Sequence, residues 1–342
     1  MMTKICSLIF FCVLLDWVAL AQNAPHSPVK IIFDTDMGSD CDDAGALALL
    51  HHYADQKEAE ILATVYTSGK VPYGAGVVEA INIFFGRSDL PVGATHDDEL
   101  GDPKDKMNAE KLAKDTVAFG NTIIHNQHAP LHTALSRNIL AVQPDNSVVY
   151  VTVGHTKGLY DLLTSLPDSS SDLSGKQLLA KKLKRWVALG ALGADNSQGN
   201  HTRDWNFLYN GTAPYTDYLV KNFPVPVYYV DGGKNVMTAK GLKNTPPGNI
   251  VRTAYRDWLW NVEQKTLDDQ RPSWDLVTVY FAVKGPGDFF EAPKAGWLSF
   301  DVEKGCRWLA GEQGPVQYFV RQKPGTDTAF AEYLNQRLSE AP

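Results

Sequence analysis

The chain has 342 residues, of which 44% are hydrophobic and 21% are charged, and its formal net charge is −7. This composition excludes a disordered tail, a collagen and a polytopic membrane protein. The acidic balance also argues against a protein that is held on nucleic acid or an anionic membrane by its net charge, because phosphate binding needs a local excess of lysine and arginine. Part of the acidic surplus is gathered in one run, at residues 34–43.

The first 21 residues resemble a secretory signal peptide. Lys4 precedes a mostly apolar stretch at residues 5–15, and residues 19–21 (Ala-Leu-Ala) are typical of a cleavage site. We therefore expect an exported protein, periplasmic or extracellular, with one mature domain over residues 22–342. The apolar stretch is shorter than the about 20 residues that a membrane span needs, so we expect no membrane association after cleavage.

Short β-branched runs alternate with helical patterns along most of the chain. The predicted strands are residues 30–33, 61–66, 148–153, 186–192 and 225–230, and the predicted helices are residues 42–53, 74–85, a segment that ends near 166 and one that begins near 212. This alternation is typical of parallel strands joined by helical crossovers. We predict an α/β fold with an open, doubly wound, mostly parallel sheet and helices on both faces. A small C-terminal hairpin is expected at residues 296–302 and 315–320, followed by a closing helix at 326–338.

The acidic run follows the first predicted strand and contains five carboxylates within ten residues. Ligands bind beyond the carboxyl ends of the strands in an open α/β sheet. A favourable interaction with the helix dipole explains Asp42 and Asp43, but it leaves Asp34, Asp36 and Asp40 without a role. Carboxylates this close repel one another, and some take up a proton unless a cation is present. Oxygen ligands favour Ca²⁺ or Mg²⁺ over zinc, so the run predicts a site for one of these cations.

The run also resembles the calcium-dependent nucleoside hydrolases of the inosine-uridine preferring type, in a divergent exported branch. The shared pattern is a strand, then Asp-x-Asp-x-Gly, then Asp-Asp-Ala at a helix start, with Met37 where the family commonly has proline and two extra residues before the Asp pair. Three later segments continue the resemblance, at residues 149–157, 204–207 (Asp-Trp-Asn-Phe) and 273–275 (Ser-Trp-Asp). It covers nearly all of residues 28–320.

The resemblance implies hydrolysis of the N-glycosidic bond of a ribonucleoside or related riboside, which gives free base and ribose. Ca²⁺ is the implied cofactor, in preference to Mg²⁺, and Asp36 is the implied catalytic base toward the attacking water. The implied metal ligands are Asp36, Asp43, the Val153 carbonyl and Asp275, with Asp34 and Asp40 as further candidates. The implied substrate-binding residues are Asp42, Asp204, Asn206 and Trp274. The analogy also suggests a homodimer or homotetramer, and a small molecule is the expected partner.

One departure from the family concerns the leaving group. The histidine that often protonates the departing base is Trp274 here, and an indole does not donate a proton near neutral pH. Stacking of the base on an aromatic ring is one substitute, and another residue could supply the proton. Besides Trp274, the aromatic candidates are Tyr255, Trp258 and Trp260, for which helix packing is the alternative interpretation. The reserve candidates for the acid are His155 and His201.

Two other hypotheses stay open at this point. The segment Phe33-Asp34-Thr35-Asp36 also resembles the start of the haloacid dehalogenase-like phosphatases, in which the first aspartate is the nucleophile. A non-enzymatic, calcium-dependent riboside-binding protein would keep the ribose pocket and lose turnover. Release of free ribose, and its dependence on Asp36, distinguishes the three hypotheses.

Overall fold

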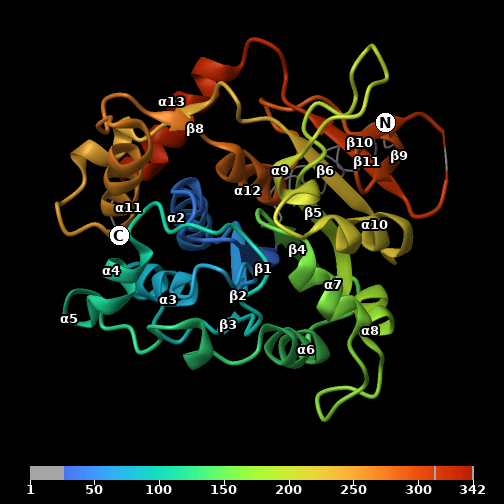
Figure 1. Ribbon diagram of the computed structural model, residues 1–342, viewed down its shortest axis with the longest axis horizontal. Coiled ribbons are helices and arrows are strands. Elements are labelled where there is room, and N and C mark those ends of the chain that lie inside the picture. The colour runs from blue at the N-terminus through green and yellow to red at the C-terminus, as the bar shows by residue number, and fades with distance from the viewer. Residues whose placement is uncertain (1–26, 312, 341–342) are drawn as a thin grey trace, which may run out of the picture.

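The computed structural model describes residues 27–311 and 313–340, so the predicted signal peptide lies outside the described residues. Nine strands form one sheet in the order β10-β9-β11-β6-β5-β4-β1-β2-β3. The strands from β11 to β3 run parallel, while β9 and β10 are antiparallel to their neighbours. The predicted α/β class with a mostly parallel sheet is therefore confirmed, and the strands pass through the middle of the molecule (Figure 1).

The elements have the following bounds. The strands of the sheet are β1 (Val29–Thr35), β2 (Ala59–Tyr66), β3 (Val92–Ala94), β4 (Val148–Thr152), β5 (Leu183–Leu189), β6 (Val227–Asp231), β9 (Lys294–Asp301), β10 (Gly305–Leu309) and β11 (Gln317–Arg321), and a separate ribbon pairs β7 (Met237–Thr238) with β8 (Arg271–Pro272). The helices of the N-terminal half are α2 (Asp42–Asp55), α3 (Gly74–Phe84), α4 (Ala109–Lys114), α5 (Thr116–Phe119), α6 (His132–Val142) and α7 (Lys157–Thr164). Those of the C-terminal half are α8 (Gly175–Lys182), α9 (Trp205–Leu208), α10 (Ala213–Asn222), α11 (Ile250–Trp258), α12 (Trp274–Lys284) and α13 (Asp327–Ser339).

The C-terminal strands pair as predicted and also extend the main sheet. β9 is antiparallel to β11, and β11 is parallel to β6. β10, which the sequence analysis missed, adds to the other side of β9. The two strands of the expected hairpin, β9 and β11, therefore belong to the antiparallel edge of the main sheet, and β11 connects this edge to the parallel strands.

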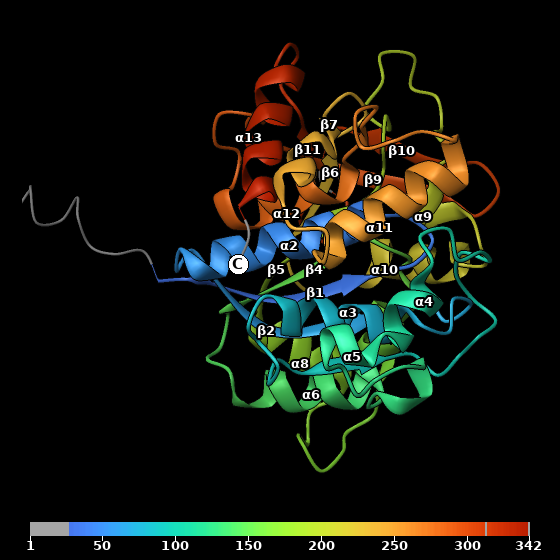
Figure 2. The ribbon, with the colours of Figure 1, turned by 90° about the vertical axis from the view of Figure 1, so that its left-hand side faces the viewer.

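Helices cover both faces of the sheet, and each face has its own apolar core. Ile31 and Phe33 of β1 belong to the core beneath α2, α3, α11, α12 and α13. Ile32 points to the opposite core, which α6, α7, α8 and α10 cover. Figure 2 shows α2, α12 and α13 above β1, with α6 and α8 below it. No helix in the described part of the chain is both long and apolar enough to cross a membrane.

The chain reverses its direction across the sheet between β1 and β4. From β1 it continues outward through β2 and β3, whereas β4, β5 and β6 follow on the other side. The register pairs Asp34 with Thr152, and the Val153 N–H donates to the Asp34 carbonyl at 2.9 Å. The loops that leave β1 and β4 therefore meet at the same end of the sheet, which is the usual place for a binding crevice in this fold class.

Close packing of α2 against α11 gives a test of this arrangement. A Cβ at Gly45 would collide with the hydroxyl of Tyr255, a fully buried ring on α11. We expect Gly45→Ala to lower the free energy of unfolding by about 1–3 kcal/mol, as overpacking does. Denaturant unfolding measures this change. Gly248→Ala is the matched control, because a Cβ at Gly248 meets nothing within 4 Å, and equal stability of the two variants would contradict the packing.

Candidate functional site

A cavity of about 350 Å³ lies at this end of the sheet. Residues selected from the sequence line it, namely Asp36, Asp40, Asp42, Asp43, Val153, Asp204, Asn206, Trp274 and Asp275. They come from the loop after β1, the first turn of α2, the loop after β4, the start of α9 and the first turn of α12. The fold thus brings together the segments that carry the family resemblance.

Three buried carboxylates form the centre of the site. Asp42 and Asp43 begin α2, Asp275 lies in the first turn of α12, and one oxygen of each lies within 4.8 Å of the others. The Asp275 N–H donates to Asp42 Oδ2 at 3.2 Å, and the Thr35 hydroxyl donates to Asp43. The two helix N-termini stabilise negative charge here through their backbone N–H groups.

These carboxylates hold their protons unusually tightly. Burial, with a smaller contribution from Asp36, raises the pKa of Asp42 to about 7. Burial and the neighbouring carboxylates raise the pKa of Asp43 and of Asp275 well above the usual range. A divalent cation would replace those protons, and the donors are all oxygen atoms, which suit a hard cation. The residues present therefore fit a divalent metal.

Arg271 supplies one positive charge beside the cluster. Its buried guanidinium forms an ion pair with Asp40 and lies 3.2 Å from Asp42 Oδ1. The rings of Trp258 and Trp274 lie against it, with centroids 4.4 and 5.5 Å from the guanidinium carbon. Asp40 is therefore held by Arg271 and does not join the group of three carboxylates. The sequence analysis missed Arg271.

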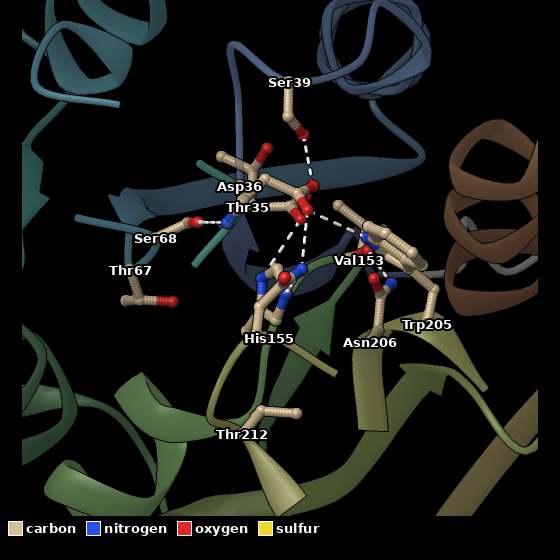
Figure 3. A network of polar contacts seen from close by, with 12 residues as sticks. Thr35, Asp36, Ser39, Thr67, Ser68, Val153, His155, Trp205, Asn206 and Thr212 are labelled. Atoms are coloured by element: carbon tan, nitrogen blue, oxygen red, sulfur yellow. Dashed lines mark hydrogen bonds and ion pairs between the residues drawn. The ribbon is translucent and has the colours of Figure 1, made fainter. Parts of the chain in front are cut away.

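Asp36 lies close to Asp43, whose pKa it helps to raise, and next to the loop after β4. Its Oδ2 lies 3.3 Å from His155 Nδ1, and Figure 3 draws this contact. A Cβ at Gly154 would come within 2.8 Å of the Asp36 side chain, so only glycine lets the β4 loop pass this closely. The Asn206 amide donates to the Val153 carbonyl at 2.6 Å (Figure 3), which fixes both residues at the edge of the cavity.

Asp34 does not line the cavity, although the sequence analysis included it as a metal candidate. Its oxygens accept hydrogen bonds from the Thr67 hydroxyl at 2.6 Å and the Tyr150 hydroxyl at 3.1 Å. Burial raises its pKa to about 8. The structure therefore gives Asp34 a role inside the sheet and not at the site.

Asp204 lines the cavity, but the backbone occupies both of its oxygens. Oδ1 accepts from the Phe207 N–H at 3.0 Å and caps α9, and Oδ2 accepts from the Leu192 N–H at 3.1 Å. Burial raises its pKa to about 6. The carboxylate joins the β5 loop to α9, so its predicted contact with substrate is less favoured than those of Asp42 and Asn206.

The aromatic candidates other than Trp274 lie outside the cavity. Tyr255 and Trp258 are buried in the core, as the helix-packing alternative predicts, and Trp260 is 59% exposed on the surface. His155 is buried behind Asp36, and His201 does not line the cavity. No histidine of the described residues lines it, so the structure offers no imidazole in place of the missing acid.

Asp102 is a site residue that the sequence analysis missed. It is buried in the irregular segment between β3 and α4, lines the cavity, and accepts hydrogen bonds from Ser39 Oγ at 2.6 Å and Trp205 Nε1 at 3.0 Å. Nothing in the local sequence marks it, because it is a lone aspartate in a loop without a periodic pattern.

The raised pKa values predict how stability depends on pH. A carboxyl group whose pKa is higher in the folded protein than in the unfolded chain makes the folded state less stable as the pH rises from the lower pKa to the higher one. In the presence of a chelator that removes divalent cations, we expect the free energy of unfolding to be lower at pH 8 than at pH 5.5 by a few kcal/mol. This is on the order of the loss expected from the raised pKa of Asp42 alone. Calcium should restore most of this loss at pH 8 and little at pH 5.5. Thermal unfolding at both pH values measures this difference. Equal stability at the two pH values in the presence of the chelator would contradict the raised pKa values of the cluster.

Comparisons with known proteins agree with this fold. Neither a known family model nor a curated protein matches the sequence. An inosine-uridine preferring nucleoside hydrolase from Bacillus anthracis is similar in structure, with a TM-score of 0.62, 14% identity, and coverage of 90% of this chain and 99% of that chain. A plant nucleoside hydrolase has a TM-score of 0.62 and 16% identity, over 92% of this chain and 100% of that chain. The type III effector protein XopQ, solved with adenosine diphosphate ribose, has a TM-score of 0.64 and 14% identity, over 94% of this chain and 96% of that chain. The chain therefore has the fold of these proteins.

Proposed function

We propose that the protein is a calcium-dependent hydrolase that cleaves the N-glycosidic bond of a ribonucleoside or related riboside. The observation that carries this proposal is the convergence of four buried carboxylates and an amide on one cavity at the switch point of the sheet. They are Asp36, Asp42, Asp43, Asp275 and Asn206. The fold shared with nucleoside hydrolases supports the same reaction class.

The carboxylates Asp36, Asp43 and Asp275 and the Val153 carbonyl would hold the calcium ion. A bound calcium ion makes a nearby water molecule more acidic and orients oxygen atoms of the substrate. Calcium fits better than magnesium, because a carbonyl and several carboxylates form a larger set of protein ligands than magnesium usually takes. The oligomeric state and export stay predictions from the sequence.

The protein's own residues divide the remaining work. Asp36 accepts the proton of the water that attacks C1′ of the sugar, as a general base. Asp42 accepts hydrogen bonds from the ribose hydroxyls, and Asn206 donates a hydrogen bond to them. Such contacts strengthen as positive charge develops on the sugar ring, so they stabilise the transition state more than the bound substrate.

Trp274 marks the side of the site where the base would leave. Its ring borders the cavity, and a second cavity of about 460 Å³ adjoins the first at Leu192 and Trp274. The indole face provides a stacking surface for a heterocycle. The second cavity provides room for the leaving group.

The structure favours this proposal over the other two hypotheses to different degrees. A phosphatase of the haloacid dehalogenase type would need Asp34 as its nucleophile, but Asp34 lies outside the cavity and is engaged by Thr67 and Tyr150. A riboside-binding protein without turnover would use the same cavity and the same carboxylates. Only measurement of product separates this second alternative from the enzyme.

The central experiment compares the wild-type protein with Asp36→Asn. With calcium and inosine or uridine, we expect the wild type to release free ribose, and the variant to lose about 10²–10⁴-fold in kcat while it still binds the nucleoside, because the general base is removed. A reducing-sugar assay and calorimetry measure the two properties. Asp217→Asn is the control, since Asp217 pairs with Lys221 on α10, outside the cavity. Equal turnover by Asp36→Asn would refute the mechanism, and no ribose from the wild type would favour the binding protein.

A second experiment tests the base side of the site. We expect Trp274→Ala to reduce kcat/KM by about 10- to 100-fold, which corresponds to the about 1–3 kcal/mol that stacking of a base on an aromatic ring contributes. Trp274→Phe should keep most of the activity, because it retains an aromatic face. Steady-state kinetics measure both variants, and a phenylalanine variant as impaired as the alanine variant would argue against stacking.

A further inference from the structure

His155 has a buried position behind Asp36 that the proposed chemistry does not yet use. His155 comes directly after Gly154 in the loop that follows β4, and its side chain is fully buried. Nδ1 lies 3.3 Å from Asp36 Oδ2 and has no hydrogen-bond partner of good geometry. Because His155 does not line either cavity at the site, it cannot reach the leaving group, and its only route to the chemistry is through Asp36.

The neighbours of His155 decide which of its ring nitrogens carries the proton. Asn210 Nδ2 is 3.2 Å from His155 Nε2 and 2.6 Å from Asp102 Oδ1. A carboxylate only accepts, so the amide nitrogen of Asn210, and not its oxygen, must face Asp102. The second hydrogen of the same amide then points to Nε2, which is the acceptor. A neutral imidazole that accepts at Nε2 carries its proton on Nδ1, and Nδ1 is the ring nitrogen that lies next to Asp36.

Asp102 anchors this chain of contacts from a distant part of the sequence. Besides the Asn210 amide, its carboxylate accepts from Ser39 Oγ at 2.6 Å and Trp205 Nε1 at 3.0 Å. Its own N–H donates to Ser68 Oγ at 3.3 Å. The loop between β3 and α4 is therefore fixed at the site, and the contacts run in one direction, from Asn210 through His155 to Asp36.

A metal ion is the competing explanation for this cluster. Asp36, Asp102 and His155 each offer a ligand atom within 4.8 Å of the others. A metal at this position would need the lone pair of Nδ1, which requires the proton on Nε2. That proton would then face the N–H of Asn210, and two donors would oppose each other. The hydrogen-bond pattern therefore favours a proton donor toward Asp36 over a second metal ligand.

We propose that His155 is a positioning residue, held by Asn210 and Asp102 in the tautomer that donates its Nδ1–H to Asp36. The proposal rests on the proposed function, in which Asp36 is the base. The donated proton fixes Asp36 Oδ2 on the β4 side, so that the other oxygen faces the cavity and the attacking water. Like-charged neighbours would otherwise push the Asp36 carboxylate away from Asp43 and Asp275.

Two substitutions of nearly equal size separate this role from simple packing. His155→Asn keeps an N–H donor close to the position of Nδ1, whereas His155→Gln places its amide close to the position of Nε2 and leaves Asp36 without a donor. We expect His155→Gln to lower kcat by about 10- to 100-fold, as loss of an orienting partner typically does, with KM nearly unchanged. His155→Asn should retain most of kcat. Equal losses in both variants, or a change confined to KM, would overturn the positioning role.

A double-mutant cycle tests whether Asn210 acts through His155. Asn210→Ala should lower kcat to a similar extent as His155→Gln, and the double variant should show no further loss, because both changes remove the same orientation of Asp36. If kcat of the double variant fell by the product of the two single losses, Asn210 and His155 would act independently, which would contradict the chain of contacts. Thermal unfolding of each variant shows whether folding is intact.

Nitrogen NMR of the histidine rings tests the arrangement without any turnover. Long-range proton–nitrogen spectra distinguish the two tautomers, and the signal absent from His155→Gln identifies His155. We expect the Nδ1–H tautomer in the wild type and its loss in Asn210→Ala. An Nε2–H tautomer, or a displaced Nδ1 signal on addition of Mn²⁺ or Zn²⁺, would overturn the proposal. If the wild type releases no ribose from inosine or uridine, the proposed function fails, and these spectra still decide whether His155 donates to Asp36.

Discussion

The burial of like-charged carboxylates at one end of a parallel sheet is the constraint on which the rest of the structure depends. Asp42 and Asp43 begin α2, and Asp275 lies in the first turn of α12, so two helix N-termini point at the same place. Their dipoles offset part of the repulsion, although each effect is only about 0.3–1 kcal/mol. Burial, together with the repulsion that is left, raises the pKa of all three carboxyls. The three carboxylates could therefore bind a divalent cation.

Arg271 offsets part of the negative charge of this acidic site. One guanidinium offsets one negative charge, and its contacts with Asp40 and Asp42 place that charge on one side of the cavity. Asp43 and Asp275 lie within 4.8 Å of Asp42, and in the proposed function they would share a cation with Asp36. Because the Trp274 ring lies against the same guanidinium, the residue that balances the acidic run also holds the surface on which a base would stack. In the proposed site, the metal ligands and the stacking surface would thus be coupled through Arg271.

The sequence was most informative where chemistry follows directly from a predicted strand. The acidic run after β1 and the segment at residues 149–157 could be assigned to one edge of the sheet, because parallel strands end on the same side. Residues 204–207 and 273–275 are assigned to the site only through the family resemblance. The alternation of side chains in β1 would also have excluded Asp34, since it shares the face of Ile32 and not that of Phe33. Asp102 and Arg271 could not be predicted. They depend on contacts between loops far apart in the chain, and no spacing in a single sequence records such contacts.

The two sides of the cavity are built to different degrees. On the ribose side, the carboxylates of the acidic run, Asn206 and the Val153 carbonyl are all fixed by strands, helix starts or hydrogen bonds. Two carboxyls at the cavity, Asp42 with a pKa of about 7 and Asp204 with a pKa of about 6, both raised by burial, could be considered as proton donors to the base. A bound cation would remove the proton from Asp42, and Asp204 is engaged by two backbone N–H groups. Neither carboxyl is therefore placed to replace the histidine of the family. In the proposed reaction, departure of the base would therefore depend on the aromatic surface of Trp274 and on how well the base itself carries the charge it gains.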